Sequence, residues 1–196
     1  MSNDFKNRYF LLRHGKNIHQ TEKKGILYNW PDDIPPCELI EEGIKEVQKA
    51  GEELKNKNID LVFCSDVFRT KQTAGLISEI IGFEKEKIIY DQRLRDINWG
   101  IFAGQDENQA WAFYENNLMK KFELSPPEGE NWNDCQQRMI LVINEIEAQY
   151  ENKNILIVSH GDPLWLLEAY FRGIPTKDLV INNNREVLKT GEIRTI

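Results

Sequence analysis

The sequence has few of the features that mark membrane, secreted or metal-binding proteins. No apolar run approaches the roughly 20 residues that cross a bilayer, and the N-terminal stretch 1–6 lacks the apolar core of a secretory signal. Its three cysteines, Cys37, Cys64 and Cys135, are an odd number without metal-ligand spacing. We therefore expect reduced thiols, a cytoplasmic protein and no membrane partner.

An excess of positive charge is also absent. The 196 residues include 25 lysines and arginines against 32 aspartates and glutamates, which gives a formal net charge of −7. A negative protein does not attract polyanions in bulk, so we expect no nucleic-acid partner. A small anionic substrate is compatible with this charge, because a few local cations can override the overall sign. The sequence does not indicate an oligomeric state.

Internal repeats and low-complexity linkers are missing, which favours one domain over residues 1–196. Residues 8–13, 60–64 and 154–159 are continuous apolar runs, typical of strands covered on both faces. They alternate with amphipathic segments at 38–57, 66–81 and 132–151, which we expect to be helices. The pattern predicts an α/β protein, a three-layer α/β/α sandwich around a mostly parallel sheet.

Shorter elements complete the expected structure. We expect a strand at 87–90, a helix rich in aromatics at 106–121, and one or two strands in the tail 178–196. Ser65 or Asp66 should cap the helix 66–81, and Asp162 should cap the helix that follows 154–159, with Pro163 in its first turn. Residues 20–37 and 105–130, which are irregular or interrupted by proline and glycine, are expected to form a flap and a cap.

Two strands end in a histidine followed by glycine, His14-Gly15 and His160-Gly161. The carboxyl ends of parallel strands are where ligands bind in open α/β sheets. Arg13 precedes the first histidine, and Arg69 lies in the first turn after the strand 60–64. Guanidinium groups match phosphoryl oxygens in bidentate fashion, and helix N-terminal amides favour anions. These residues together predict a phosphate pocket.

Other candidate residues have simpler interpretations. A metal site on His14 and His160 lacks a third ligand at a recognised spacing, so we expect no metal and no cofactor. His19 has no partner pattern and is expected at the surface. Glu130 either forms a hydrogen bond near the pocket or begins a helix. The aromatic residues of the expected cap favour packing over a substrate box; they are Trp111, Phe113 and Tyr114.

Five segments, in order, resemble one known family. They are Leu12-Arg13-His14-Gly15, Ser65-Asp66-Val67-Phe68-Arg69-Thr70-Lys71-Gln72-Thr73-Ala74, Leu94-Arg95-Asp96 through Gly104, Pro127-Glu128-Gly129-Glu130 and Ser159-His160-Gly161. The set resembles the histidine phosphatase superfamily, the phosphoglycerate mutase-like proteins, over about residues 8–165. The resemblance implies that family's three-layer fold.

The resemblance also implies roles for individual residues. His14 would be the nucleophile that becomes phosphohistidine, and Arg13, Arg69 and His160 would bind the transferring phosphoryl group. Asp96 stands at the acidic position, usually glutamate, and would protonate the leaving alcohol and then activate water. Gln20 falls where many members have a phosphate-binding asparagine. The implied activity is a metal-independent phosphomonoesterase acting on a small phosphorylated substrate.

Three alternatives stay open at this point. A phosphoglycerate-type mutase needs inserted segments that close over a bisphosphate, and 196 residues look short for them. A protein-phosphohistidine phosphatase would have fewer segments over its site than the flap and cap expected here. An inactive module that binds a phosphorylated ligand would follow if Asp96 cannot reach the leaving group.

Overall fold

A five-stranded sheet in the order β3-β2-β4-β1-β5 forms the centre of the computed structural model, which describes residues 5–196. The strands are β1 (Arg8–Arg13), β2 (Leu61–Cys64), β3 (Ile89–Tyr90), β4 (Asn154–Ser159) and β5 (Ile193–Thr195). The pairs β1–β4, β2–β4 and β2–β3 are parallel, and β5 pairs with β1 in the antiparallel direction. The predicted mostly parallel sheet is confirmed. Residues 1–4, part of the stretch inspected for a secretory signal, lie outside the described residues.

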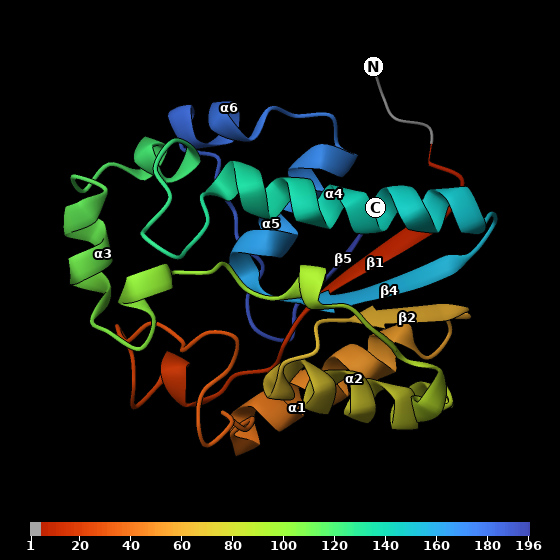
Figure 1. The fold of residues 1–196 in the computed structure, drawn as a ribbon. Coiled ribbons are helices and arrows are strands. Elements are labelled where there is room, and N and C mark those ends of the chain that lie inside the picture. Colours follow the sequence, from red (N-terminus) through yellow and green to blue (C-terminus); the bar gives the residue numbers. More distant parts are fainter. Residues whose placement is uncertain (1–4) are drawn as a thin grey trace.

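Helices cover both faces of the sheet (Figure 1). Phe10 and Leu12 of β1 pack in one apolar cluster with residues of α1 (Glu41–Leu54) and α2 (Phe68–Ile81). Tyr9 and Leu11, which alternate with them, pack with α4 (Trp132–Gln149) and α5 (Gly161–Phe171) on the opposite face. Because successive strand residues point to opposite faces, one continuous apolar run supplies both clusters. The predicted three-layer α/β/α architecture is confirmed.

The register of β1 and β4 places the two His-Gly pairs side by side. Arg13 is the partner of Ser159 in this register, and the His14 N–H donates to the Ser159 carbonyl at 3.1 Å. Both strands therefore end at the same level of the sheet, and the residue after each strand enters the same space. β2 ends beside β4, so Ser65 joins them at this edge.

Two long connecting segments, called here the first and second excursions, lie beyond this edge. The first excursion joins β1 to α1 and contains η1 (Ile18–Gln20). The second excursion joins β3 to α4 and contains η4 (Gly100–Phe102), α3 (Glu107–Phe113) and η5 (Leu118–Phe122). Backbone hydrogen bonds join the two excursions, from Leu27 N to Gln105 O at 2.9 Å and from Glu107 N to Gly25 O at 2.7 Å. The remaining short turns are η2 (Lys85–Lys87) and η3 (Gln92–Leu94).

One predicted element, the helix 106–121, is wrong, and the predicted tail of one or two strands is confirmed only in β5. The expected helix 106–121 is broken after Phe113, where Glu115 and Asn116 both have φ of 54°, a left-handed conformation that ends a helix. The tail forms helix α6 (Thr176–Ile181) before it reaches the short strand β5. The apolar residues of 178–181 pack as part of a helical turn, a pattern too short to separate helix from strand by periodicity.

Both predicted N-caps are also wrong. Val67 is the N-cap of α2, without a side-chain hydrogen bond, and His160 is the N-cap of α5. Asp162 lies inside the first turn of α5, where charged partners bind its carboxylate. Ser65 and Asp162 thus contact side chains of the pocket and do not cap the helices. No helix within residues 5–196 combines the length and apolar character that crossing a membrane requires.

Candidate active site

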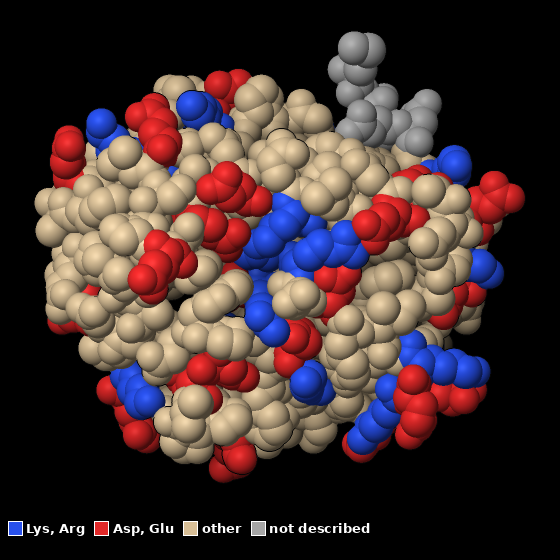
Figure 2. Space-filling view, viewed as in Figure 1, with Lys and Arg blue, Asp and Glu red and all other residues tan. Residues whose placement is uncertain are grey.

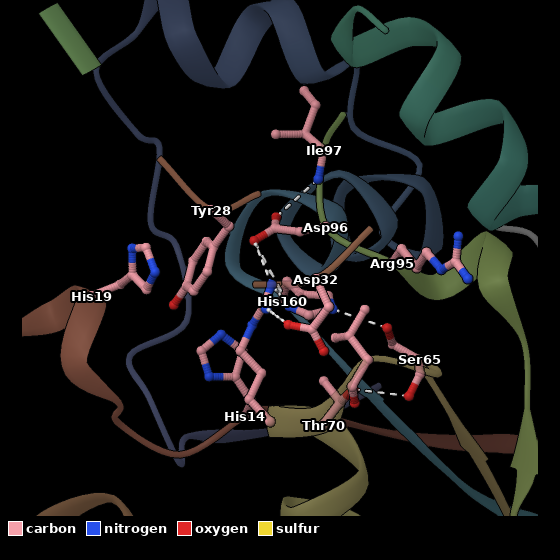
Figure 3. A network of polar contacts seen from close by, with 12 residues as sticks. His14, His19, Tyr28, Asp32, Ser65, Thr70, Arg95, Asp96, Ile97 and His160 are labelled. Atoms are coloured by element: carbon pink, nitrogen blue, oxygen red, sulfur yellow. Dashed lines mark hydrogen bonds and ion pairs between the residues drawn. The ribbon is translucent and has the colours of Figure 1, made fainter. Parts of the chain in front are cut away.

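His14 lies directly after β1 and is buried (Figure 3). Its Nδ1 is 2.9 Å from the Gly15 carbonyl oxygen, which can only accept a hydrogen bond, so Nδ1 is the protonated nitrogen. Burial, and then the positive charges of Arg69 and Arg13, hold the pKa of His14 well below its usual value. The ring is therefore neutral, with the Nε2 lone pair available for attack.

Arg69, in the first turn of α2, is 1% exposed and reaches several groups at once. Its Nη2 is 3.1 Å from His160 Nδ1 and 3.4 Å from an Asp96 carboxylate oxygen. Asp32 lies 3.5 Å from Nη1, and the guanidinium stacks on the Tyr28 ring with 3.8 Å between Cζ and the ring centre. Its Nε and Nη1 are buried without a hydrogen-bond partner. A buried donor without an acceptor is costly, so these N–H groups favour an anionic ligand.

Arg13 is the second guanidinium of the site. Its Nη1 donates to the Leu188 carbonyl at 2.7 Å, and its Nε is buried without a partner. A Cβ at Gly161 would lie 3.1 Å from the Arg13 Cζ, tighter than ordinary contact. Glycine after the second histidine therefore leaves room for the side chain that ends β1.

His160 faces His14 across the strand ends, with 5.3 Å between ring centres. Arginine can only donate, so His160 Nδ1 accepts from Arg69 and Nε2 carries the proton toward Ser65 Oγ at 3.0 Å. Burial and the neighbouring Arg69 charge hold its pKa well below the usual value. His160 is thus a neutral ring of fixed tautomer. The sequence did not indicate Ser65 as its partner; the signal was a polar residue directly after β2.

Asp96 follows η3 and borders the same space. Its Oδ1 accepts from the Ile97 N–H at 2.9 Å, and its Oδ2 lies 3.7 Å from His160 Nδ1. The side chain keeps 20% of its surface exposed. Burial raises the pKa of this carboxyl against the opposing effect of Arg69. A carboxyl whose pKa is raised holds its proton to higher pH, as a general acid must.

Arg138 fixes the backbone around Asp96. Its guanidinium donates to the carbonyl oxygens of Arg95 at 2.9 Å and Asp96 at 2.8 Å. Glu130 binds the same guanidinium at 2.7 Å and accepts from the Asn98 N–H at 2.9 Å. Of the two interpretations of Glu130, the hydrogen bond near the pocket is confirmed, and α4 begins at Trp132.

Gln20 belongs to the turn η1 and its amide already has partners. Its Oε1 accepts from the Asn17 N–H at 3.0 Å, and its Nε2 donates to the Tyr28 hydroxyl at 2.8 Å. Gln20 lines the cavity but has no hydrogen bond to either histidine. Tyr28 and Asp32 occupy the space against Arg69 instead, and of these two the sequence did not indicate Asp32 as a site residue.

A cavity of about 480 Å³ opens beside Asp96 and Arg13. Leu27, Trp99 and Arg185 line both it and a smaller cavity of about 150 Å³, which Lys121 and Trp111 also line. Asp162 accepts from Lys121 at 3.2 Å and from the Trp132 indole at 2.9 Å, and pairs with Arg185. On the face of the molecule seen in Figure 2, lysine and arginine side chains gather near the middle, with acidic side chains beside them.

The expectation that His19 lies at the surface is wrong. The side chain is 7% exposed, and its Nε2 is 2.6 Å from an Asp33 carboxylate oxygen. Its ring stacks on Tyr28 with 4.0 Å between ring centres (Figure 3), and both residues line the larger cavity. Of the expected aromatic packing residues, Tyr114 is buried, whereas Trp111 borders the smaller cavity.

Several solved structures share this fold. Bacillus stearothermophilus YhfR aligns with a TM-score of 0.78 at 24% identity, covering 97% of this chain and 90% of that one. A mycobacterial glucosyl-3-phosphoglycerate phosphatase aligns with a TM-score of 0.76 at 22% identity, covering 96% and 88% of the two chains. At these identities the likeness concerns the fold.

Curated sequences and a family profile complete the comparison. The chain is 28% identical over 177 residues to a 2,3-bisphosphoglycerate-dependent phosphoglycerate mutase of Methylobacterium sp., covering 86% of this chain and 82% of that one. It is 25% identical to a phosphoglycerate mutase of Schizosaccharomyces pombe, covering 89% and 83%. The profile of the histidine phosphatase superfamily (branch 1) matches residues 9–186. The chain belongs to that superfamily.

Proposed function

We propose that this protein hydrolyses a small phosphomonoester through a phosphohistidine formed on His14. The observation that carries the proposal is the combination of a neutral His14, with its Nδ1 fixed by Gly15, and three buried guanidinium nitrogens without a hydrogen-bond partner. Those nitrogens belong to Arg13 and Arg69. Phosphoryl transfer needs positioning and charge stabilisation above all, and these groups supply both.

In the first step His14 Nε2 attacks phosphorus in line with the ester oxygen. A nitrogen–phosphorus bond forms as the oxygen–phosphorus bond breaks. Arg13 and Arg69 donate to the equatorial oxygens, and His160 lies beside them. Asp96 gives its proton to the departing oxygen, so the leaving group departs as a neutral alcohol. A covalent intermediate divides one difficult displacement into two easier ones.

In the second step a water molecule attacks the phosphohistidine. Asp96, now a carboxylate, accepts the water proton, and His14 leaves as a neutral ring. Inorganic phosphate departs and both side chains return to their first protonation states. Every proton in this cycle moves through a side chain of the site, so we expect the reaction to need no metal.

The three cysteines are buried free thiols, in keeping with a reducing cytoplasm.

The leaving group fits the cavity beyond Asp96. Its walls combine apolar surface from Leu27 and Trp99 with the guanidinium of Arg185, and Lys121 lies in the adjoining space. Besides Asp96 and Arg13, the charged groups that line the two cavities are Lys24, Lys121 and Arg185 against the carboxylates of Asp162 and Glu107. We expect substrates whose leaving group carries a carboxylate or a second phosphate to bind better than neutral ones.

The test uses the wild type and the His14→Asn variant, which keeps side-chain size similar. Both are incubated with p-nitrophenyl phosphate and a panel of phosphorylated metabolites, and phosphate release is measured. We expect turnover and an acid-labile phosphoenzyme in the wild type, and neither in the variant. Equal phosphate release by both proteins would reject the proposal. Binding of substrates without turnover in the wild type would favour an inactive binding module.

A mutase is the second candidate, because the matching curated relatives are named phosphoglycerate mutases. The two activities share the phosphohistidine and differ in its acceptor, which is water in one case and a second substrate hydroxyl in the other. Incubation with 3-phosphoglycerate and a bisphosphate primer separates them. Conversion to 2-phosphoglycerate faster than phosphate release would replace the hydrolase proposal with the mutase.

A further inference from the structure

Three potential metal-ligating side chains lie together in the first excursion, next to Tyr28. One ring nitrogen of His19, one carboxylate oxygen of Asp33 and the Cys37 sulfur all lie within 4.8 Å of one another. Their exposures are 7%, 4% and 3%. Nitrogen, oxygen and sulfur from these residue types form the donor set that zinc prefers. None of the three contacts the reacting atoms of the proposed phosphatase mechanism.

The hydrogen bonds around the cluster orient two of these donors. His19 Nδ1 is 2.9 Å from the Ile26 carbonyl oxygen, so it donates there and leaves Nε2 facing Asp33. One oxygen of Asp33 accepts from the Asn29 backbone N–H at 3.1 Å and from its side-chain amide at 2.8 Å. The other oxygen faces His19 at 2.6 Å. A histidine that ligates a metal usually donates its other ring N–H to a carbonyl or carboxylate, and a ligating carboxylate is usually hydrogen-bonded as well. His19 and Asp33 have both kinds of contact.

The charges of the cluster suit a divalent cation. Asp33 accepts two hydrogen bonds from Asn29 and lies 2.6 Å from His19 Nε2, contacts that suit a carboxylate. Cys37 is a buried free thiol. A zinc ion would replace two protons, one on His19 Nε2 and one on the thiol. The ion, one carboxylate, one thiolate and a neutral imidazole sum to zero charge, which avoids an uncompensated buried charge.

We propose that His19, Asp33 and Cys37 form a binding site for a thiophilic divalent cation, with zinc as the expected ion. Three protein ligands leave one position of a tetrahedral ion for water. The site would connect residues 19, 33 and 37 of the first excursion. Tyr28, stacked on His19, and Asp32, next to Asp33, both contact Arg69. The ion would therefore stabilise the positions of Tyr28 and Asp32 against Arg69, without taking part in the chemistry.

Cobalt is the probe for this site, because cobalt bound to a thiolate absorbs in the near ultraviolet by charge transfer. The full chain is stripped with a chelator, dialysed and titrated with Co²⁺. We expect one equivalent to bind with a thiolate band and the visible bands of a tetrahedral ion. We expect Cys37→Ser and His19→Gln to lose these bands. Cys64→Ser is the matched control, because the buried Cys64 thiol donates to the Ser65 carbonyl and a hydroxyl can replace it.

Two results would overturn the proposal: a wild type without the thiolate band, or a band that persists in folded Cys37→Ser. If that variant fails to fold, X-ray absorption on the zinc-loaded wild type decides. We expect one sulfur at about 2.3 Å and nitrogen or oxygen ligands at about 2.0–2.2 Å. A spectrum without a sulfur shell would reject the site.

Discussion

His14 and His160 face each other at 5.3 Å between ring centres, yet their ring nitrogens have different partners. His14 keeps its Nε2 free and gives Nδ1–H to a backbone carbonyl. His160 has both nitrogens occupied, by Arg69 and by Ser65. The asymmetry supports the assignment of attack to His14 and of positioning to His160.

Asp96→Asn tests the general acid. The amide cannot donate a mobile proton, so we expect kcat for an alkyl phosphate to fall by about 10²- to 10⁴-fold. The loss with p-nitrophenyl phosphate should be smaller, because that leaving group departs without protonation. Asp96→Glu is the control, since it restores the carboxyl with one more methylene. An unchanged rate for the alkyl phosphate in Asp96→Asn would remove this residue from the mechanism.

The dependence of kcat/KM on pH should be bell-shaped. His14 must be unprotonated to attack, so activity falls as pH drops through its pKa, which lies well below 6.5. Asp96 must be protonated, so activity falls as pH rises through its pKa, which is raised above 3.8. With p-nitrophenyl phosphate, the alkaline limb should weaken in Asp96→Asn. An alkaline limb that is identical in both proteins would assign it to another group.

Ser65→Ala should lower activity without removing a group that contacts the substrate. The change leaves the His160 Nε2–H without its acceptor in a buried site, which costs about 1–3 kcal/mol. We expect kcat/KM to fall by about tenfold and the alternative tautomer of His160 to become visible by NMR. Ser65→Thr, which keeps the hydroxyl, should retain the original tautomer. Full activity with an unchanged His160 spectrum in Ser65→Ala would deny Ser65 this role.

Arg138→Met should weaken both stability and catalysis. It leaves Glu130 and the carbonyls of Arg95 and Asp96 without their partner in a partly buried site, and each acceptor left unpaired costs about 1–3 kcal/mol. Denaturant unfolding measures this loss. Lys45→Gln is the control, because both members of its ion pair with Glu41 are exposed and such pairs contribute about 1 kcal/mol or less. Equal losses in the two variants would contradict the special position of Arg138.

Arg185→Gln should discriminate between substrates. For a leaving group with a carboxylate or second phosphate, we expect KM to rise about tenfold, equivalent to 1.4 kcal/mol. For p-nitrophenyl phosphate, KM should stay within twofold. Arg172→Gln, at a partly exposed ion pair with Glu168, serves as the surface control. A uniform rise of KM for both classes of substrate would argue against a subsite for a second anion.

Much of the scaffold could be predicted because its signals are local. The strands predicted at 8–13 and 154–159 match β1 and β4, since continuous apolar runs between helices leave few alternatives. The family and the fold class are likewise confirmed. The roles of His14, Asp96 and Gln20 stay predictions, although the structure places them around one cavity or next to it.

The wrong helix caps and the wrong placement of His19 have a common cause in long-range pairing. Asp162 and Ser65 have the sequence position of helix caps, but Lys121, Arg185 and His160 draw them into the pocket from distant segments. His19 is polar and lacks a local partner, and only the path of the chain brings Asp33 to it. Local propensity cannot register such partners, because their energy depends on residues far away in the sequence.

The contacts of Arg69 also bear on how strongly an anion can bind. Without substrate, the carboxyl groups of Asp32 and Asp96 already lie 3.5 and 3.4 Å from this guanidinium. An incoming phosphate must compete with them, so its measured affinity is a difference between two sets of ion pairs. In the proposed hydrolysis, product phosphate would meet the same competition, which would favour its release.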